Sequence, residues 1–132
     1  MPSPARIGGA AGDPADLYAV VQDAINGGDL DAFVDAHDPD ATVGRDDDGV
    51  VARGHAEVRA AMAALLDLRP QLQMTAVRVL QRDGLALAHG RWRLTVVDEG
   101  SRIELSRLGA MVSRRGEDGS WRIVLDDPLM GP

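Results

Sequence analysis

The sequence predicts an α+β fold in which three N-terminal helices pack on a curved, mostly antiparallel sheet. Up to Pro70, apolar residues recur with helical spacing; after Pro70 they alternate with the period of two that strands require. The later segments are joined by turns that contain glycine, which is typical of an antiparallel meander. Because the helices and the long strands occupy separate parts of the chain, the pattern does not fit a parallel βαβ fold.

Three helices are predicted before Pro70, each from a start signal, an apolar stripe and a stop signal. An aspartate or a glycine turn starts each helix, and glycine or proline stops it. The starts fall at Asp13-Pro14, at Asp29 and at Gly54 or His55, and the stops at Gly27-Gly28, Asp38-Pro39 and Leu68-Arg69. Short strands are expected over residues 41–44 and 50–52, on either side of an acidic turn.

Four long strands are predicted after Pro70, over residues 72–82, 85–97, 102–115 and 121–126. A curved sheet wrapped by the helices is the packing that buries the apolar residues of both layers. The length of 132 residues fits one domain, which we assign to residues 13–132. Residues 1–12 are rich in glycine and proline, lack the apolar core of a signal peptide, and are expected to form a flexible leader.

The composition excludes several classes of function. The chain has no cysteine, which removes disulfides, thiolate nucleophiles and Cys-ligated metal centres. All 14 basic residues are arginine, so Schiff-base chemistry and a Walker lysine are impossible. The formal net charge of −7 argues against nucleic-acid binding. No apolar stretch approaches the roughly 20 residues that span a bilayer, so we expect a cytoplasmic protein without membrane contact.

Several separated motifs resemble the NTF2-like superfamily, which includes ketosteroid isomerase and the SnoaL-like polyketide cyclases. In the order of the family they are Asn26-Gly27-Gly28-Asp29-Leu30-Asp31-Ala32-Phe33, Pro39-Asp40-Ala41-Thr42-Val43, Arg53-Gly54, Leu85-Ala86-Leu87-Ala88-His89-Gly90-Arg91-Trp92 and Asp118-Gly119-Ser120-Trp121-Arg122-Ile123. The chain looks like the small bacterial SnoaL-like, DUF4440-type proteins over about residues 13–128. The resemblance implies a cone-shaped half-barrel with one pocket on the concave sheet face, and homodimers that pack through the sheet.

The catalytic residues of the characterised relatives do not carry over to this chain. When the chain is aligned with ketosteroid isomerase on the first motif, the catalytic tyrosine of the isomerase corresponds to Val21 and its general base to a position near Arg45. Its carboxylic hydrogen-bond donor corresponds to Ala110 or Met111. Because none of these residues can do the same chemistry, the isomerase mechanism is excluded. An epoxide hydrolase of this fold also needs an acid on the central strand as the partner of Asp126, and that strand offers Arg91 and Arg93 but no acid before Asp98. The acidic turn also lacks the ligand spacing of a calcium loop, so no metal and no cofactor is expected.

The remaining titratable candidates are three histidines and one aspartate. His37 ends the second helix, where it can serve as an acid or base near neutral pH or, as a cation, stabilise the helix end. His55 is expected to be exposed, and His89 to lie on the outer or dimer face. Asp126 ends the last strand and is either a base whose pKa is raised by burial or the partner of an arginine.

Apolar candidates suggest a pocket. Trp92 follows Ala88 and Gly90 on one strand face, which predicts either a hollow with one aromatic wall or ordinary core filling. Relatives often carry polar residues near Leu108 and Met111, and the apolar replacements favour an apolar ligand. Together with Tyr18, which is the sole phenol, the expected ligand pocket comprises Tyr18, Trp92, Leu108 and Met111.

Two functions are consistent with these observations. The first is a homodimer that binds a small hydrophobic molecule and, if it is an enzyme, catalyses a cofactor-free isomerisation, cyclisation or dehydration with His37 and Asp126 as acid and base. The alternative is a non-catalytic module for ligand binding or dimeric association. The sequence leaves the choice between them open.

Overall fold

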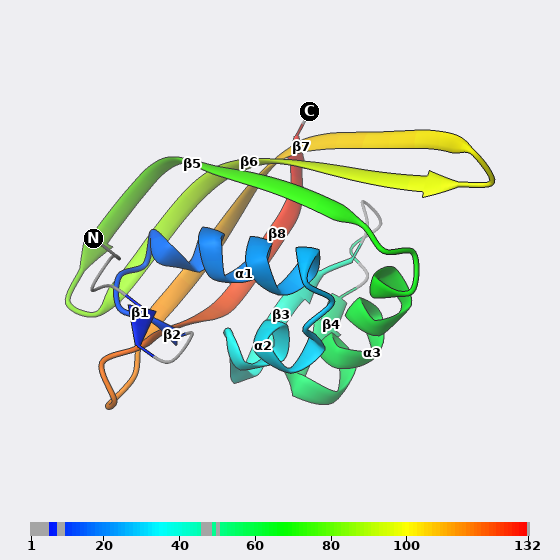
Figure 1. Cartoon of the computed structure of the whole chain (residues 1–132). Helices are drawn as coiled ribbons and strands as arrows, with labels where there is room; N and C mark the ends of the chain where they lie inside the picture. Colours follow the sequence, from blue (N-terminus) through cyan, green and yellow to red (C-terminus); the bar gives the residue numbers. More distant parts are fainter. Residues whose placement is uncertain (1–5, 8–9, 46–48, 50, 132) are drawn as a thin grey trace.

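The computed structural model describes residues 6–7, 10–45, 49 and 51–131, and its helices pack on one side of a long, bent sheet (Figure 1). The expected acidic turn at Asp46-Asp47-Asp48 lies outside the described residues. In chain order the elements are β1 (Arg6–Ile7), β2 (Ala10–Ala11), α1 (Asp16–Asn26), α2 (Leu30–Asp35), β3 (His37–Gly44), β4 (Val51–Arg53), α3 (Gly54–Leu66), β5 (Gln71–Arg82), β6 (Leu85–Asp98), β7 (Ser101–Arg115) and β8 (Trp121–Gly131).

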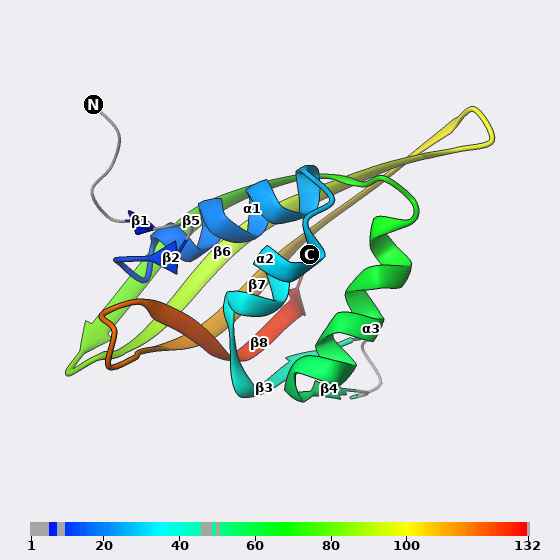
Figure 2. The ribbon, with the colours of Figure 1, turned by 60° about the horizontal axis from the view of Figure 1, so that its bottom comes forward.

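The sheet is open and mostly antiparallel, which confirms the α+β class. Its strands follow the order β1-β2-β8-β7-β6-β5, and β3 pairs with both β4 and β8. The pairing of β3 with β8 is parallel, and the other pairings are antiparallel. Figure 2 shows α1, α2 and α3 on one side of the sheet, with the β6–β7 hairpin extending beyond α3. No described helix is both long enough and apolar enough to cross a membrane.

The helices differ from the expected arrangement in two respects. Only α1 and α3 are long, since α2 has six residues. Between α2 and α3 the strands β3 and β4 occur as expected, although β3 begins earlier than predicted, at His37. The start of α1 also falls later than predicted: Asp13 accepts hydrogen bonds from the backbone of Ala15 and Asp16 in a turn that precedes the helix.

Two polar side chains of α1 fix the helix against the edge strand β5. Asn26 donates from Nδ2 to the carbonyl oxygen of Leu72 (2.9 Å) and accepts from the Leu72 backbone N–H (2.6 Å). One turn earlier, Gln22 accepts from the backbone N–H of Met74 (2.9 Å). These bonds satisfy edge groups that would otherwise be open to water or to another chain. They also set the position of α1, and therefore of its inward-facing side chains, over the sheet.

Strand register separates an inner face, under the helices, from an outer face. Directly paired residues of neighbouring strands point to the same face. Ala88 pairs with Met111, and both are buried on the inner side. Their neighbour Leu87 pairs with Val112 on the outer side, where Leu87 is exposed. The hydrophobic core thus lies between the inner face and the helices.

Candidate functional site

Asp126 lies on the inner face of β8. It pairs with Met111 of β7 and with Val43 of β3, both of which contribute to the core. Burial, with a smaller contribution from the charge of Asp127, raises the pKa of Asp126 from 3.8 to about 7. Among the described residues Asp126 has no ion-pair partner. Its carboxyl group is therefore divided between its two protonation states near neutral pH.

Tyr18 of α1 packs its ring on the backbone of Gly90 in the middle of β6. A Cβ atom at Gly90 would lie 2.7 Å from both Cζ and Oη of Tyr18, so this close approach requires glycine. The Tyr18 hydroxyl is buried and has no hydrogen-bond partner among the described residues. Burial and the charge of Asp126 raise the pKa of Tyr18 to about 12. Tyr18 and Asp126 are thus within electrostatic reach, and the phenol stays protonated at neutral pH.

Trp92 anchors the strand segment that follows Asp126. It lies on the inner face opposite Met74, is partly buried, and packs against the core. Its indole Nε1 donates to the carbonyl oxygen of Pro128 (2.8 Å). At this point the register between β7 and β8 shifts, and a Cβ at Gly109 would lie 3.1 Å from the Pro128 Cα. The two contacts hold the irregular end of β8 in place, next to the carboxyl groups.

His37 begins β3 and is almost fully buried, with 1% of its surface exposed. Its Nδ1 lies 2.8 Å from the carbonyl oxygen of Phe33, and because a carbonyl only accepts, Nδ1 carries the proton. Burial lowers the pKa of His37 below its usual 6.5, so the ring is neutral at physiological pH. One of the two expected roles of His37 was to stabilise the end of α2 as a cation. A neutral ring does not have this role.

His37 and Asp126 do not form one acid–base pair. His37 pairs with Ile123 of β8, whereas Asp126 pairs with Val43, six residues further along β3. Because the register of β3 shifts between these pairs, only three residues separate Ile123 from Asp126 on β8, which at about 3.3 Å per strand residue is roughly 10 Å. The charged form of His37 is instead disfavoured by His55, whose Nε2 lies 2.8 Å from the His37 backbone carbonyl oxygen.

The other sequence candidates lie away from the inner face. His55, expected to be exposed, is partly buried against β3. His89 shares the outer face with Leu87 and pairs with Ala110, as expected. Leu108 also pairs on the outer side, opposite Arg91. The inner group that the structure brings together is therefore Tyr18, Trp92, Met111 and Asp126.

Two cavities in the described part of the chain bear on these candidates. The first, about 420 Å³, involves mainly outer-face residues and is lined by Thr42, Val51, Leu87, Val112, Leu125 and Asp127, with contributions from Met111 and Asp126. Tyr18, Trp92 and Leu108 are not in its lining. The second, about 680 Å³, lies between α1, α2 and the start of β8 and includes His37. Sequence reasoning missed this second cavity, although Asp29 at the N-cap of α2 and Asp31 and Asp35 within that helix line it.

No set of three or more His, Asp or Glu side chains in the described ranges is arranged to hold a metal ion. Sequence reasoning also missed the pairing of Gly90 with Tyr18. A glycine at the centre of a long strand signals close approach by another group, which here is the phenol ring.

The model of the SnoaL-like domain family matches residues 18–124 of this chain. The chain belongs to this family. No curated protein matches the sequence.

Among solved structures, an NTF2-like protein with a cystatin-like fold from Novosphingobium aromaticivorans is similar, with a TM-score of 0.73, 18% identity, and coverage of 85% of this chain and 75% of that one. A protein named as a calcium/calmodulin-dependent protein kinase type II association domain from Thiobacillus denitrificans has a TM-score of 0.72 and 23% identity, covering 89% and 95%. A ketosteroid isomerase-like protein from Erwinia carotovora atroseptica has a TM-score of 0.71 and 16% identity, covering 85% and 89%. These similarities establish the fold that this SnoaL-like chain shares with them.

Proposed function

We propose that this SnoaL-like chain binds a small hydrophobic carbonyl compound beside Asp126, where the cavity of about 420 Å³ reaches Met111 and Asp126, and moves a proton on it without a cofactor. One observation carries the proposal: a carboxyl group with a pKa of about 7, Asp126, lies within electrostatic reach of the buried, unpartnered hydroxyl of Tyr18. Perturbed titratable groups of this kind concentrate at functional sites. The apolar surfaces of Trp92 and Met111 provide the surroundings that a hydrophobic substrate needs.

The proposed reaction divides the work between the two groups. Ionised Asp126 removes a proton from the carbon next to the carbonyl group, and the electron pair moves onto the carbonyl oxygen. Tyr18, which stays protonated, donates a hydrogen bond to that oxygen as its negative charge develops. The proton on Asp126 then returns to the same or another carbon, which gives exchange or isomerisation. A base with a pKa near the working pH is best matched to this task.

The test is proton exchange at an apolar ketone. 2-Tetralone is incubated with the protein in D₂O, and the loss of its α-proton NMR signal is followed between pH 5 and 9. We expect catalysis that rises through about pH 7 and then levels off, because ionised Asp126 is the active form. Asp126→Asn should lower the rate by about 10²–10⁴-fold, the usual contribution of a general base. Tyr18→Phe should lower it by about 10²-fold or more while retaining the pH midpoint near that of the wild type.

Asp127→Asn is the matched control. Asp127 lies next to Asp126 but pairs with Ala110 on the outer side, and its charge contributes to the raised pKa of Asp126. This variant should keep the plateau rate and shift the midpoint of the pH profile downward. Exchange at the uncatalysed rate in the wild type, or equal rates for Asp126→Asn and wild type, would refute the proton-transfer role.

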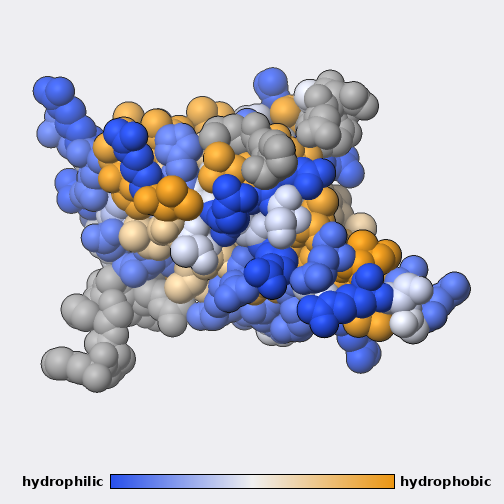
Figure 3. Space-filling view, turned by 90° about the horizontal axis from the view of Figure 1, so that it is seen from above, coloured by the Kyte–Doolittle hydropathy of each residue, from blue (hydrophilic) through white to orange (hydrophobic). Residues whose placement is uncertain are grey.

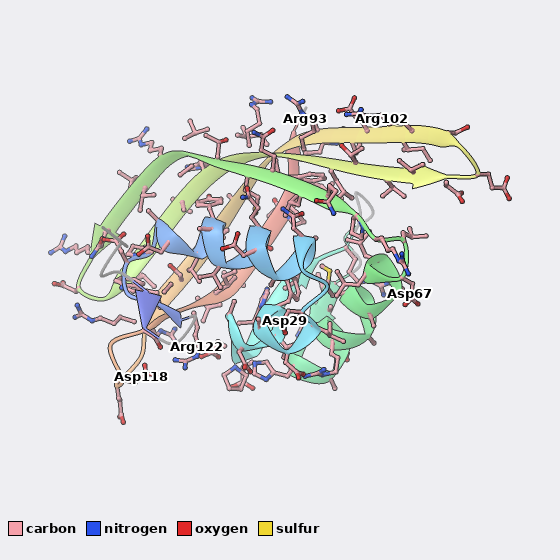
Figure 4. The ribbon with its side chains drawn as sticks, viewed as in Figure 1. Asp29, Asp67, Arg93, Arg102, Asp118 and Arg122 are labelled. Atoms are coloured by element: carbon pink, nitrogen blue, oxygen red, sulfur yellow. The ribbon has the colours of Figure 1, made fainter. Side chains whose placement is uncertain are left out.

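A second proposal, homodimerisation through the sheet, rests on the outer face. Four leucines there are exposed by 38–52%: Leu80, Leu85, Leu87 and Leu125. Figure 3 views the molecule from this side and shows hydrophobic patches beside hydrophilic ones. Arg93 and Arg102, which form exposed ion pairs with Glu104, lie on the same side (Figure 4). Apolar surface of this kind on a small domain marks a contact with another protein. If the exchange assay is negative and the chain sediments as a dimer, the non-catalytic association module becomes the better proposal.

A further inference from the structure

The larger cavity, here called the α1–α2 cavity, combines apolar walls with an acidic rim. Its volume of about 680 Å³ is in the range of small-molecule sites. The apolar part of the lining consists of Leu17 and Val20 of α1, Ala32 of α2 with its C-cap residue Ala36, and Trp121 of β8. The charges come from Asp29 at the N-cap of α2, from Asp31 and Asp35 within the helix, and from Arg122 of β8. Figure 4 shows Asp29 on the α2 side and Arg122 beside Asp118 at the turn before β8.

The charges of the α1–α2 cavity are not balanced. Arg122 is paired with Asp118 (3.2 Å), and Asp31 is paired with Arg59 (2.8 Å). In the described part of the chain, Asp29 and Asp35 have no ion-pair partner. Asp29 uses one oxygen to cap α2 through the Ala32 N–H (3.0 Å), which leaves its second oxygen available. The rim therefore carries excess negative charge and favours a cation.

His37 adds a hydrogen-bond acceptor to the same cavity. Its ring is almost fully buried, and its Nδ1 is committed to the Phe33 carbonyl oxygen. The remaining nitrogen, Nε2, bears a lone pair and has no partner among the described residues. Bulk water does not reach this atom, so its bonding capacity is unfilled in the free protein. His37 belongs to the lining of the cavity, so a donor N–H from a ligand that displaces the side chains covering Nε2 would fill it.

We propose that the α1–α2 cavity binds a small organic cation: a primary ammonium group on a compact apolar body. The ammonium donates to His37 Nε2 and is balanced by Asp29 and Asp35, while the apolar body packs on Leu17 and Trp121. A metal ion does not fit, because in the described residues no three acidic or histidine side chains converge on one point. An anion does not fit, because Arg122 is already paired and the other charged groups of the lining are acidic. This site is independent of the one around Asp126.

Titration calorimetry with three probes of similar shape tests the charge requirement. The probes are benzylammonium, benzyl alcohol and benzoate, each added to the full-length protein at pH 7. We expect benzylammonium to bind and the neutral and anionic probes to bind at least about tenfold more weakly, because they lack the charge that the rim selects. Equal affinity for benzyl alcohol, or no binding of benzylammonium at millimolar concentration, would overturn the proposal.

Variants and NMR locate the bound cation. Asp35→Asn should weaken benzylammonium binding by about fivefold or more, whereas Asp67→Asn, at the far end of α3 (Figure 4), should leave it unchanged. His37→Phe retains a ring of similar size and should also weaken binding. Because that variant alters the core, the ¹⁵N resonance of His37 Nε2 in the wild type provides a second measurement: a new donor moves it upfield. Binding that leaves this resonance unmoved and is insensitive to Asp35→Asn would refute the site.

Discussion

Replacing Asp126 with asparagine should make the folded protein more stable at alkaline pH and change its stability little near pH 4. The pKa of Asp126 is raised in the folded state, from 3.8 to about 7, so the native protein holds a proton that the unfolded chain releases. The free energy of unfolding of the wild type therefore falls as the pH rises between these two values, and it loses nothing more from this group above about pH 7. Asparagine does not titrate, so the free energy of unfolding of the variant does not fall for this reason.

The size of the effect follows from the same two pKa values. A difference of about three pH units, at about 1.36 kcal/mol each, sets an upper value of about 4 kcal/mol for the destabilisation caused by Asp126 above pH 7. The carboxyl group is only partly buried by surface area, and water contact reduces the penalty. We therefore expect Asp126→Asn to be about 2–4 kcal/mol more stable than the wild type at pH 8.

Urea unfolding, followed by the fluorescence of the two tryptophans, measures this difference. The free energies of unfolding of the wild type and Asp126→Asn are compared at pH 5, 6, 7 and 8. Because the other carboxylates are present in both proteins, their titration cancels in the difference between the two free energies. Asp127→Asn serves as the comparison: it removes only the smaller cause of the raised pKa of Asp126, so it should keep most of the pH dependence of the wild type. An Asp126→Asn variant that is less stable than the wild type at pH 8, or whose stability advantage is the same at pH 5 and pH 8, would show that Asp126 is not destabilising when ionised.

Three further predictions concern packing, anchoring and assembly. Gly90→Ala should destabilise the protein by about 1–3 kcal/mol in urea unfolding, because the new methyl group overlaps the ring of Tyr18; an unchanged midpoint would contradict the close contact. Trp92→Phe removes the hydrogen bond to Pro128 and should cost about 1 kcal/mol. Faster amide exchange at the end of β8 should accompany it, and unaltered exchange there would count against the anchor. Leu87→Glu should convert a sedimenting dimer to a monomer, whereas a wild type that is already monomeric at micromolar concentration would remove the dimer proposal.

Most of the fold could be predicted because the signals for each element are local. Pro70 marks the change from helical to strand periodicity, and β5 begins at the next residue. The turns at Asp83-Gly84 and Glu99-Gly100 have positive φ values, as their residue types suggest. The length of α2 was overestimated because its end depends on how the chain enters β3, where His37 pairs with β8 rather than extending the helix.

The candidate site was predictable only in part. Asp126 was selected because it ends an apolar strand, and its raised pKa has the direction expected from burial. Its separation from His37 was not predictable, because it depends on the parallel register of β3 against β8. Likewise, the packing of Tyr18 on Gly90 brings together residues that are 72 positions apart in the sequence, and the glycine is the only local feature that indicates it.

Composition and periodicity by themselves determined the class of fold, the places where strands turn, and the absence of thiol and lysine chemistry, because these depend on residue identity and on neighbours within a few positions. The tertiary structure alone decided which polar atoms lose contact with water and which charges face them. Those properties set the pKa of Asp126 and leave the hydroxyl of Tyr18 and the Nε2 of His37 without partners. They arise from contacts between distant segments, so no window of sequence contains them.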